Sequence, residues 1–129
     1  MQITRQRPET QRGATENFTG TVWLDELAAP PAPSRLRMFN VHFAPGAHTA
    51  WHRHPHGQVL HVLQGEGLVQ RRGAAVERIR AGDTVWIEPG EWHGAGPGTF
   101  MTHLAVVEAA DDGTTTEWDT HVAAADRPA

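Results

Sequence analysis

Short apolar segments alternate with turn-forming residues along most of this 129-residue chain. Residues 35–43 are rich in large apolar side chains, as in a buried strand. A second strand is expected at residues 58–63. The glycines of Gln64-Gly65-Glu66-Gly67 then indicate a hairpin, from which residues 68–72 return. The middle of the chain is therefore predicted to be β-structure.

The same pattern continues through the second half of the chain. Turns at Gly73-Ala74, Ala81-Gly82-Asp83 and Glu88-Pro89-Gly90-Glu91 bound further strands, which are expected at residues 76–80, 84–87 and 100–108. No segment has the periodicity of an amphipathic helix. Many short, evenly spaced strands are typical of a β-sandwich or β-barrel, so the fold class is all-β.

The length of the chain fits one domain with one core. Residues 1–20 are expected to form an arm with one short strand at most, and residues 21–110 the barrel. Residues 111–129 are expected to form a C-terminal tail that packs on the barrel and frays at its end. Pro30-Pro31-Ala32-Pro33 reads as a stiff connector that cannot continue a strand ladder.

Composition argues against several classes of function. The net charge is −4 and no basic stripe is present, which gives little support for nucleic-acid binding. No apolar run approaches the roughly 20 residues that span a bilayer. The polar first dozen residues lack the apolar stretch of a secretion signal, so we expect a cytoplasmic protein. The absence of cysteine rules out disulfides and thiolate metal sites.

The chain has nine histidines, and their spacing suggests a metal site. Side chains at positions i and i+2 of a strand point to one face, so His52 and His54 can converge on one ion. Gln58 can add an oxygen from the next strand, and His93, after the Pro89-Gly90 turn, is the natural fourth donor. The alternative is a chance surface pair at His52 and His54. The remaining histidines apart from His103 are read as surface, turn or interface residues: His42, His48, His56, His61 and His121.

Two motifs over roughly residues 40–108 resemble those of the cupin superfamily. The first is glycine, two histidines one residue apart, glutamate and glycine, and it corresponds to Gly46, His52, His54, Gln58 and Gly65, with Gln58 in the glutamate position. The second corresponds to Gly82, Glu88 in a proline position, Gly90 and His93, with Pro97 in an asparagine position. The resemblance implies a single-domain jelly-roll β-barrel whose metal ligands are His52, His54, Gln58 and His93.

A closer resemblance is to small bacterial cupins that include the manganese-dependent hydroxynitrile lyases. It rests on the segments Phe18–Val22, Pro45–His52, Pro55–Gln58 and Met101–Ala105. Those proteins also carry glutamine in place of the usual glutamate. They have His-Trp-His-Gly after the Pro-Gly turn, with the second histidine implicated as the acid/base. This chain has only Trp92-His93-Gly94, so it reads as two residues shorter and as lacking one histidine.

Gln58 and His103 set the expected chemistry. A site that holds a divalent ion with three imidazoles and one carboxylate has a net charge of about +1. An amide in place of the carboxylate raises the net charge to about +2. This favours Lewis-acid chemistry over oxygen activation. His103 is the candidate for proton transfer, because the analogous histidine of the lyase-like cupins faces the cavity. The alternative is that His103 orients a metal ligand through a hydrogen bond.

Strand parity predicts a small, mostly apolar substrate pocket. Its expected walls are Phe39, Val41, Phe43, Leu60, Val62 and Val107, with the Thr49 hydroxyl near the metal. Trp51 and Trp92 flank ligand positions and are expected to pack rather than react.

Three functions fit this sequence. The leading hypothesis is a metal-dependent lyase that cleaves a carbon–carbon bond of a small organic substrate, as in cyanohydrin cleavage. The second is an iron or manganese dioxygenase, and the third is a non-catalytic small-molecule binder. We expect one divalent ion per chain, Mn²⁺ or Fe²⁺ first, with Ni²⁺ and Zn²⁺ not separable from sequence. The expected assembly is a homodimer or a higher even-numbered oligomer.

Overall fold

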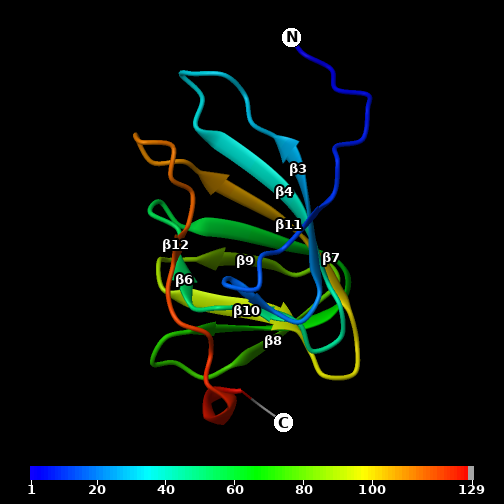
Figure 1. Cartoon of the computed structure of the whole chain (residues 1–129), viewed down its shortest axis with the longest axis vertical. Coiled ribbons are helices and arrows are strands. Elements are labelled where there is room, and N and C mark those ends of the chain that lie inside the picture. The colour runs from blue at the N-terminus through cyan, green and yellow to red at the C-terminus, as the bar shows by residue number, and fades with distance from the viewer. Residues whose placement is uncertain (128–129) are drawn as a thin grey trace.

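The computed structural model describes residues 1–127, and nearly all of its regular structure is β-strand (Figure 1). The all-β prediction is therefore confirmed. The strands are β1 Gln11–Arg12, β2 Phe18–Thr19, β3 Val22–Ala28, β4 Leu36–Phe43, β5 His48–Thr49, β6 His52–Arg53, β7 Gln58–Arg71, β8 Glu77–Arg80, β9 Thr84–Ile87, β10 Glu91–Ala95, β11 Met101–Glu108 and β12 Glu117–Trp118, followed by one 3₁₀ turn at Ala124–Asp126.

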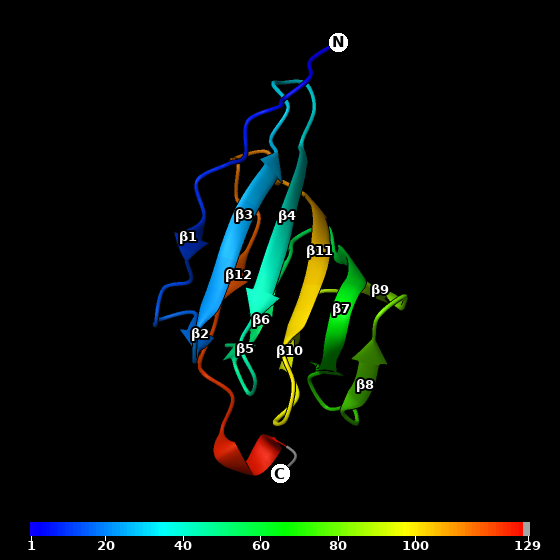
Figure 2. The ribbon, with the colours of Figure 1, turned by 90° about the vertical axis from the view of Figure 1, so that its right-hand side faces the viewer.

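The strands form a single antiparallel sheet that curls into two facing layers (Figure 2). One layer has the order β1, β3, β4, β11 and the first half of β7, with β9 at its edge. The other contains the second half of β7, flanked by β8 and β10, and continues to β5 and β2, with β6 and β12 beside β10. This curled sheet is the jelly-roll arrangement that the sequence predicted.

The predicted hairpin at residues 64–67 is wrong, because β7 runs without a turn from Gln58 to Arg71. Residues up to Gly65 pair with β11, whereas residues from Glu66 onward pair with β8 and those from Gly67 onward with β10. Gly65 has a φ of 79°, and a Cβ there would meet the carbonyl oxygen of Phe100 at 1.9 Å. The glycines therefore allow one strand to cross between layers, and do not mark a chain reversal.

Three strand regions at the ends of the chain were not predicted. The arm contains both β1 and β2, and β3 continues the sheet between β1 and β4. In the tail, β12 pairs with β6, and Val122 is buried against Trp51, Leu68 and Trp92. The end of the predicted frayed segment, residues 128–129, lies outside the described residues. The tail thus forms part of the second layer through residues far from it in sequence.

The main core lies between the two layers. Its fully buried members include Val22, Phe43, Leu60, Val62 and Met101. Alternation along β11 places His103, Ala105 and Val107 on this inner side, with exposed fractions of 0%, 3% and 4%. Among residues 1–127, no helix is long and apolar enough to cross a membrane.

Candidate metal centre

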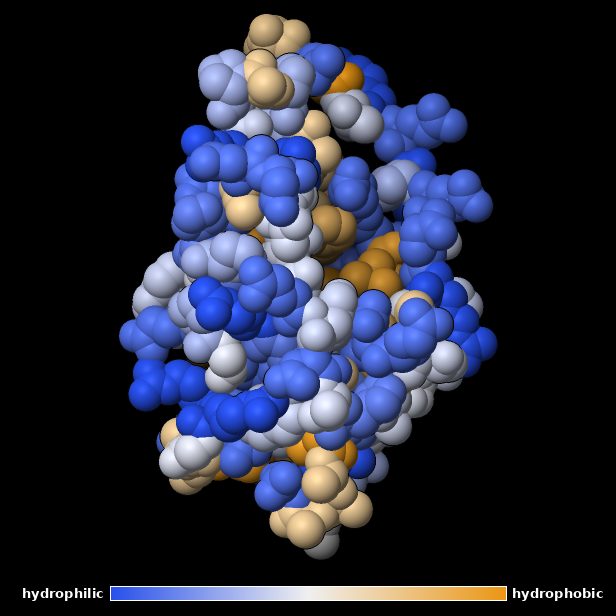
Figure 3. Space-filling view, turned by 60° about the vertical axis from the view of Figure 1, so that its left-hand side comes forward, coloured by the Kyte–Doolittle hydropathy of each residue, from blue (hydrophilic) through white to orange (hydrophobic). Residues whose placement is uncertain are grey.

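A small cavity of about 100 Å³ opens between the two layers at one end of the barrel. His52, His54, Gln58, His93 and His103 all line it. Its remaining walls are mostly apolar or aromatic side chains: Phe18, Leu24, Phe39, Val41, Thr49, Ala105, Val107, Thr115, Thr116 and Trp118. Figure 3 shows one face of the molecule, where apolar side chains lie in a recess framed by polar residues. Polar donors therefore gather at one part of an otherwise apolar chamber.

Two imidazoles of this cavity are held with Nε2 free. His52 Nδ1 donates to the Ala50 carbonyl oxygen at 2.9 Å, and His54 Nδ1 donates to the Thr115 carbonyl oxygen at 2.9 Å. A donating Nδ1 fixes the tautomer in which Nε2 carries the lone pair that a metal needs. The ring centroids lie 4.9 Å apart although β6 itself ends at Arg53. Both rings are thus oriented as a metal site requires.

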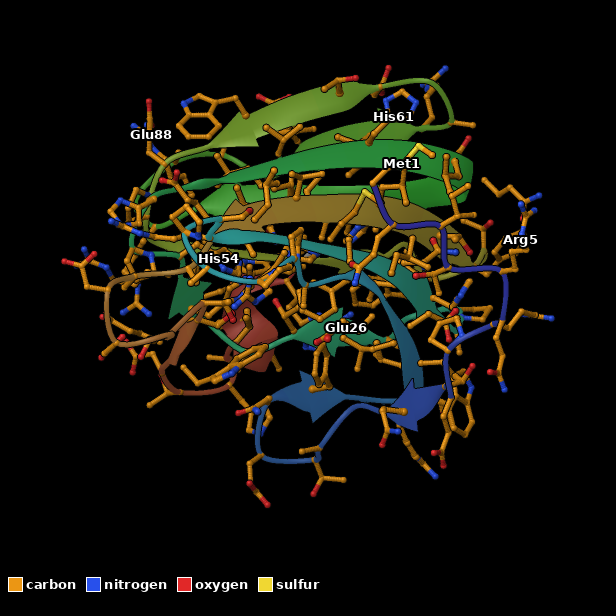
Figure 4. All side chains as sticks on the ribbon, turned by 90° about the horizontal axis from the view of Figure 1, so that it is seen from above. Met1, Arg5, Glu26, His54, His61 and Glu88 are labelled. Carbon is orange, nitrogen blue, oxygen red and sulfur yellow. The ribbon has the colours of Figure 1, made fainter. Side chains whose placement is uncertain are left out.

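Glu91, which the sequence predicted to lie in a turn, is a buried carboxyl group. It begins β10, its side chain is 1% exposed, and its Oε1 lies 3.9 Å from His52 Nε2 and 3.8 Å from His54 Nε2. In the described part of the chain, neither carboxylate oxygen has a hydrogen-bond partner, and the same holds for Gln58 Oε1 and His54 Nε2. Figure 4 labels His54 at this end of the barrel, whereas His61 and Glu88 lie on the outer surface.

His93 and His103 form a second pair of imidazoles in the cavity. His103 Nε2 and His93 Nδ1 are 3.2 Å apart, which is a hydrogen bond between the two rings. The backbone N–H of His93 donates to the Thr49 hydroxyl at 3.1 Å. The ring of Phe43 packs against both imidazoles, at centroid distances of 5.6 and 5.4 Å. These contacts hold both rings in place where the two residues line the cavity.

Burial controls the charge of every group in the cavity. It lowers the pKa of His52 to about 3 and that of His103 to about 4, and it lowers the pKa of His54 and His93 as well. All four imidazoles are therefore neutral near pH 7 and can act as ligands or proton acceptors. Burial also raises the pKa of Glu91 to about 9. A cation beside this carboxyl would reverse that effect, because it stabilises the ionised form.

The donor set fits a divalent ion. A buried carboxylate, an amide oxygen and free imidazole nitrogens without internal partners are costly unless something positive neutralises them. His52, Glu91 and His93 each offer a ligand atom, and these atoms lie within 4.8 Å of one another. Oxygen and imidazole donors together suit a first-row divalent metal. The cavity therefore has the residues that a cupin-type metal centre needs.

The structure separates the residues predicted to line the pocket into two groups. Phe39, Val41, Thr49 and Val107 line the cavity, whereas Phe43, Leu60 and Val62 lie in the core and are not among its lining residues. The three core residues share the inward parity of Gln58, Phe39 and Val41, but they lie farther along β7 and β4 and pack in the core. Parity alone gives the face of a strand and not the depth along it.

The prediction that His48 is a surface, turn or interface residue is wrong, because its side chain is buried. It is 2% exposed, its Nδ1 lies 3.1 Å from the Gly46 carbonyl oxygen, and its ring packs against Trp92. It sits opposite Gly94, where a Cβ would approach the His48 Cβ to 2.3 Å. The missing side chain at Gly94 makes room for this imidazole.

The sequence reading missed Glu91 and the tail residues Thr115, Thr116 and Trp118. Glu91 had a detectable signal, since Glu91 and His93 are two residues apart on a strand and must share a face. The tail residues had no such sequence signal, because their contacts depend on how this polar segment packs against β6. Trp118 nevertheless lies over His52, with ring centroids 4.9 Å apart.

Fold and cavity together define a class of protein. A family model described as a cupin domain matches residues 39–100, and the solved structures similar to this chain include a cupin-like protein that is 32% identical. The chain belongs to the cupin family, which confirms the resemblance seen in the sequence.

Within that family, a curated relative is similar over most of the chain. The (R)-mandelonitrile lyase of Granulicella tundricola is 51% identical over 113 residues, which is 86% of each chain. A cupin-like protein from Thermotoga maritima is 32% identical, with a TM-score of 0.83 over 97% of this chain and 94% of that one. A cupin 2 conserved barrel domain protein from Rhodopseudomonas palustris is 20% identical, with a TM-score of 0.71 over 92% and 79%, and this likeness shows the fold alone.

Proposed function

We propose that this protein is a metal-dependent lyase that cleaves a cyanohydrin into an aldehyde and hydrogen cyanide. The observation that carries the proposal is the gathering of metal donors and a second imidazole pair on one apolar cavity. The 51% identity to an (R)-mandelonitrile lyase supports the same chemistry.

One divalent ion, Mn²⁺ or Fe²⁺ first, would be held by His52, His54 and Gln58, together with a donor from β10. That strand offers both Glu91 and His93. When bound, such an ion supplies a Lewis acid that stabilises negative charge on the substrate oxygen. His52 and His54 are already oriented for this by the carbonyls that accept their Nδ1 protons.

The His93–His103 pair would move the proton. Cleavage of a cyanohydrin requires that the hydroxyl proton leave the oxygen while the bond between the carbinol carbon and the nitrile carbon breaks. The electron pair of that bond departs with cyanide, which takes up a proton. A neutral imidazole within the pair can accept the hydroxyl proton and return it to cyanide, with the second ring sharing the charge through the 3.2 Å hydrogen bond.

The apolar walls would receive the organic group of the substrate. Phe18, Phe39 and Trp118 offer aromatic surface, and Leu24, Val41 and Val107 offer aliphatic surface. A small aromatic or aliphatic side group is desolvated in such a chamber, and its hydroxyl is left to the polar end. The expected substrate class is therefore a small cyanohydrin with an apolar substituent.

The test is aldehyde release from mandelonitrile by purified protein whose metal content has been measured. We expect turnover by metal-loaded protein and none above background after chelation. Protein that carries one metal per chain yet releases no aldehyde from any of a panel of small cyanohydrins would contradict the proposal.

Oxygen activation is the second candidate, and Glu91 is the observation that favours it. A buried carboxylate beside the imidazoles would offset the added charge of an oxidised ion. Oxygen uptake, recorded on the same metal-loaded samples with small organic acids and alcohols, separates the two. Oxygen consumption without aldehyde release would favour the oxidoreductase.

A further inference from the structure

We propose that Glu91 is the fourth metal ligand of this site and that His93 is not a ligand but the proton-transfer partner of His103. The inference rests on the proposed metal centre and replaces the sequence-based assignment of His93 to the ion. It makes the set two imidazoles, one amide and one carboxylate.

Register places Glu91 at the metal end of the cavity. The Cα of Glu91 pairs directly with that of His52 across β10 and β6. One oxygen, Oε1, lies at nearly equal distances from His52 Nε2 and His54 Nε2, 3.9 and 3.8 Å. Two nitrogens bound to a common ion at about 2.0–2.2 Å are spaced from a third donor by distances only slightly shorter than these. Glu91 therefore completes a cluster that the two histidines begin.

Hydrogen bonding separates the two candidates on β10. Both Glu91 oxygens are buried and unpartnered in the described chain, as are His54 Nε2 and Gln58 Oε1. His93, by contrast, uses Nδ1 for His103 and its backbone N–H for Thr49. Neither oxygen of Glu91 thus has a hydrogen-bond partner in the described chain, whereas one nitrogen of His93, Nδ1, already has His103 as its partner.

The local sequence agrees with this division. Glu91-Trp92-His93-Gly94 resembles the His-Trp-His-Gly segment of the lyase-like cupins at its last three positions, with Glu91 in place of the first histidine. The shortening then falls in the turn before β10, where deletions are best tolerated, and not within the strand. Trp92 keeps its place on the opposite face, fully buried and donating to Gln70 Oε1 at 2.6 Å. The chain therefore has a carboxylate in place of the first histidine and has not lost the second.

The carboxylate changes the electrostatics inferred from Gln58 alone. With Glu91 bound, the net charge of the centre is about +1 and not about +2. The Gln58 amide on β7 is neutral, whereas a glutamate there would carry a negative charge. Glu91 on β10 supplies that charge instead. Oxygen donors in the set also favour Mn²⁺ or Fe²⁺ over softer ions.

The experiment compares metal binding by the full-length wild type and four variants. Glu91→Gln keeps the shape and removes the charge, and His93→Asn removes the competing ligand. Gln58→Glu combined with Glu91→Gln returns the carboxylate from the other strand. Glu88→Gln is the matched control, since Glu88 is an exposed acid three residues away that pairs with Arg71. The readouts are metal content, Mn²⁺ affinity by titration and the Mn²⁺ electron paramagnetic resonance spectrum.

Glu91→Gln should weaken Mn²⁺ binding by about 100-fold or more, since loss of a mere hydrogen-bond partner of a ligand costs about 10- to 100-fold. The double variant should recover most of this loss. His93→Asn and Glu88→Gln should bind Mn²⁺ within about threefold of wild type, and His93→Asn alone of these two should lose turnover. Equal thermal unfolding of the metal-free proteins shows that Glu91→Gln still folds.

Two outcomes would overturn the inference, and only one of them would also overturn the proposed function. Wild-type affinity in Glu91→Gln together with lost binding in His93→Asn would reassign the fourth ligand to His93, with the proposed function intact. Absence of any metal binding by the wild type would remove both the inference and the proposed function.

Discussion

Each of the four buried imidazoles in the cavity has one nitrogen in a hydrogen bond, and the partner of that nitrogen decides what the ring can do. His52 and His54 donate to backbone carbonyls, which leaves Nε2 free as a ligand atom. His93 and His103 are bonded to each other, which suits a shared proton. In the proposed function, the same type of side chain would bind the metal in one pair and move the proton in the other.

At this scale, the first prediction concerns His103. Replacing it with alanine removes the ring that bonds His93 Nδ1, so turnover should fall by about 10²–10⁴-fold. Metal content should stay at the wild-type level, because His103 contacts no proposed ligand except through His93. The measurement is aldehyde release at matched metal loading. Loss of the metal along with activity would instead assign His103 to holding the centre together.

Spacing along one strand predicted that His52 and His54 would share a cavity, and the cupin motif added Gln58 from the next strand. Glu91 was missed although the same spacing relates it to His93, because Pro89-Gly90 favoured a turn that included Glu91, which in fact begins β10. The sequence pattern also does not indicate how far along a strand the pocket extends. Leu60 and Val62 were therefore predicted to line the pocket, but they lie in the core. Periodicity reports which face a side chain takes, and tertiary packing decides what it meets there.

At the scale of elements, the site depends on β7 serving both layers. Its first residue, Gln58, reaches the cavity from one layer, and its second half supports β10, which carries Glu91 and His93. Gly65 is the point where the strand passes from one layer to the other. Gly65, which does not line the cavity, thus helps to position β7 and β10, the two strands that carry Gln58, Glu91 and His93.

Gly65→Ala should therefore destabilise the fold strongly. A left-handed φ costs a non-glycine residue about 1–2 kcal/mol, and the collision with the Phe100 carbonyl adds about 1–3 kcal/mol. Gly73→Ala is the matched control, since its φ of 82° is similar but nothing lies within 4 Å of the added Cβ. Urea unfolding should show a loss two- to threefold larger at Gly65. Equal losses would mean that the backbone conformation alone matters.

A polar network ties the N-terminal arm to β3 and β4. The Thr10 hydroxyl donates to Asp25 Oδ1 at 2.5 Å, and Asp25 Oδ2 lies 3.0 Å from His42 Nε2. These hydrogen bonds, Thr10 first and His42 second, lower the pKa of Asp25 below 3.8, with a smaller contribution from the charge of Arg7. The ionised carboxylate therefore stabilises the fold above about pH 4, and this contribution disappears as pH falls through its lowered pKa.

Asp25→Asn should remove that contribution. At pH 7 the variant should be less stable than wild type by about 1–3 kcal/mol, the usual value of hydrogen bonds to a charged group. The difference should shrink below pH 4, where the wild-type carboxyl becomes protonated. Unfolding curves across this pH range check the sign. A difference that stays constant with pH would show that the charge of Asp25 is irrelevant.

Elements at the ends of the chain were harder to anticipate than those in the middle. The acidic residues Asp25 and Glu26 and a register shift in β3 obscure its alternation, although Asp25 is buried through its hydrogen bonds. Strand β12 has only two residues and exists because it pairs with β6. Such short strands form because of the strand they pair with, and no local sequence pattern predicts them.

At the scale of the whole molecule, large apolar side chains remain exposed on the outer side of one layer. Trp23 and Leu27 on β3, Leu63 on β7 and Trp86 on β9 are 42%, 37%, 41% and 60% exposed. Such side chains, with the free edge at β1, are typical of a surface that pairs with another copy. We expect a homodimer or a higher even-numbered oligomer. Light scattering should give at least twice the 14.2 kDa chain mass, and a monomer at tens of micromolar would contradict this.

The central claim is that one divalent ion lies in the cavity and is held through His52 and His54. Elemental analysis of protein purified without chelator, for wild type and for the variant in which both histidines are alanine, tests it most directly. The account predicts close to one manganese or iron per wild-type chain and almost none in a variant that still folds. A folded double variant that keeps the full complement of metal would contradict the site.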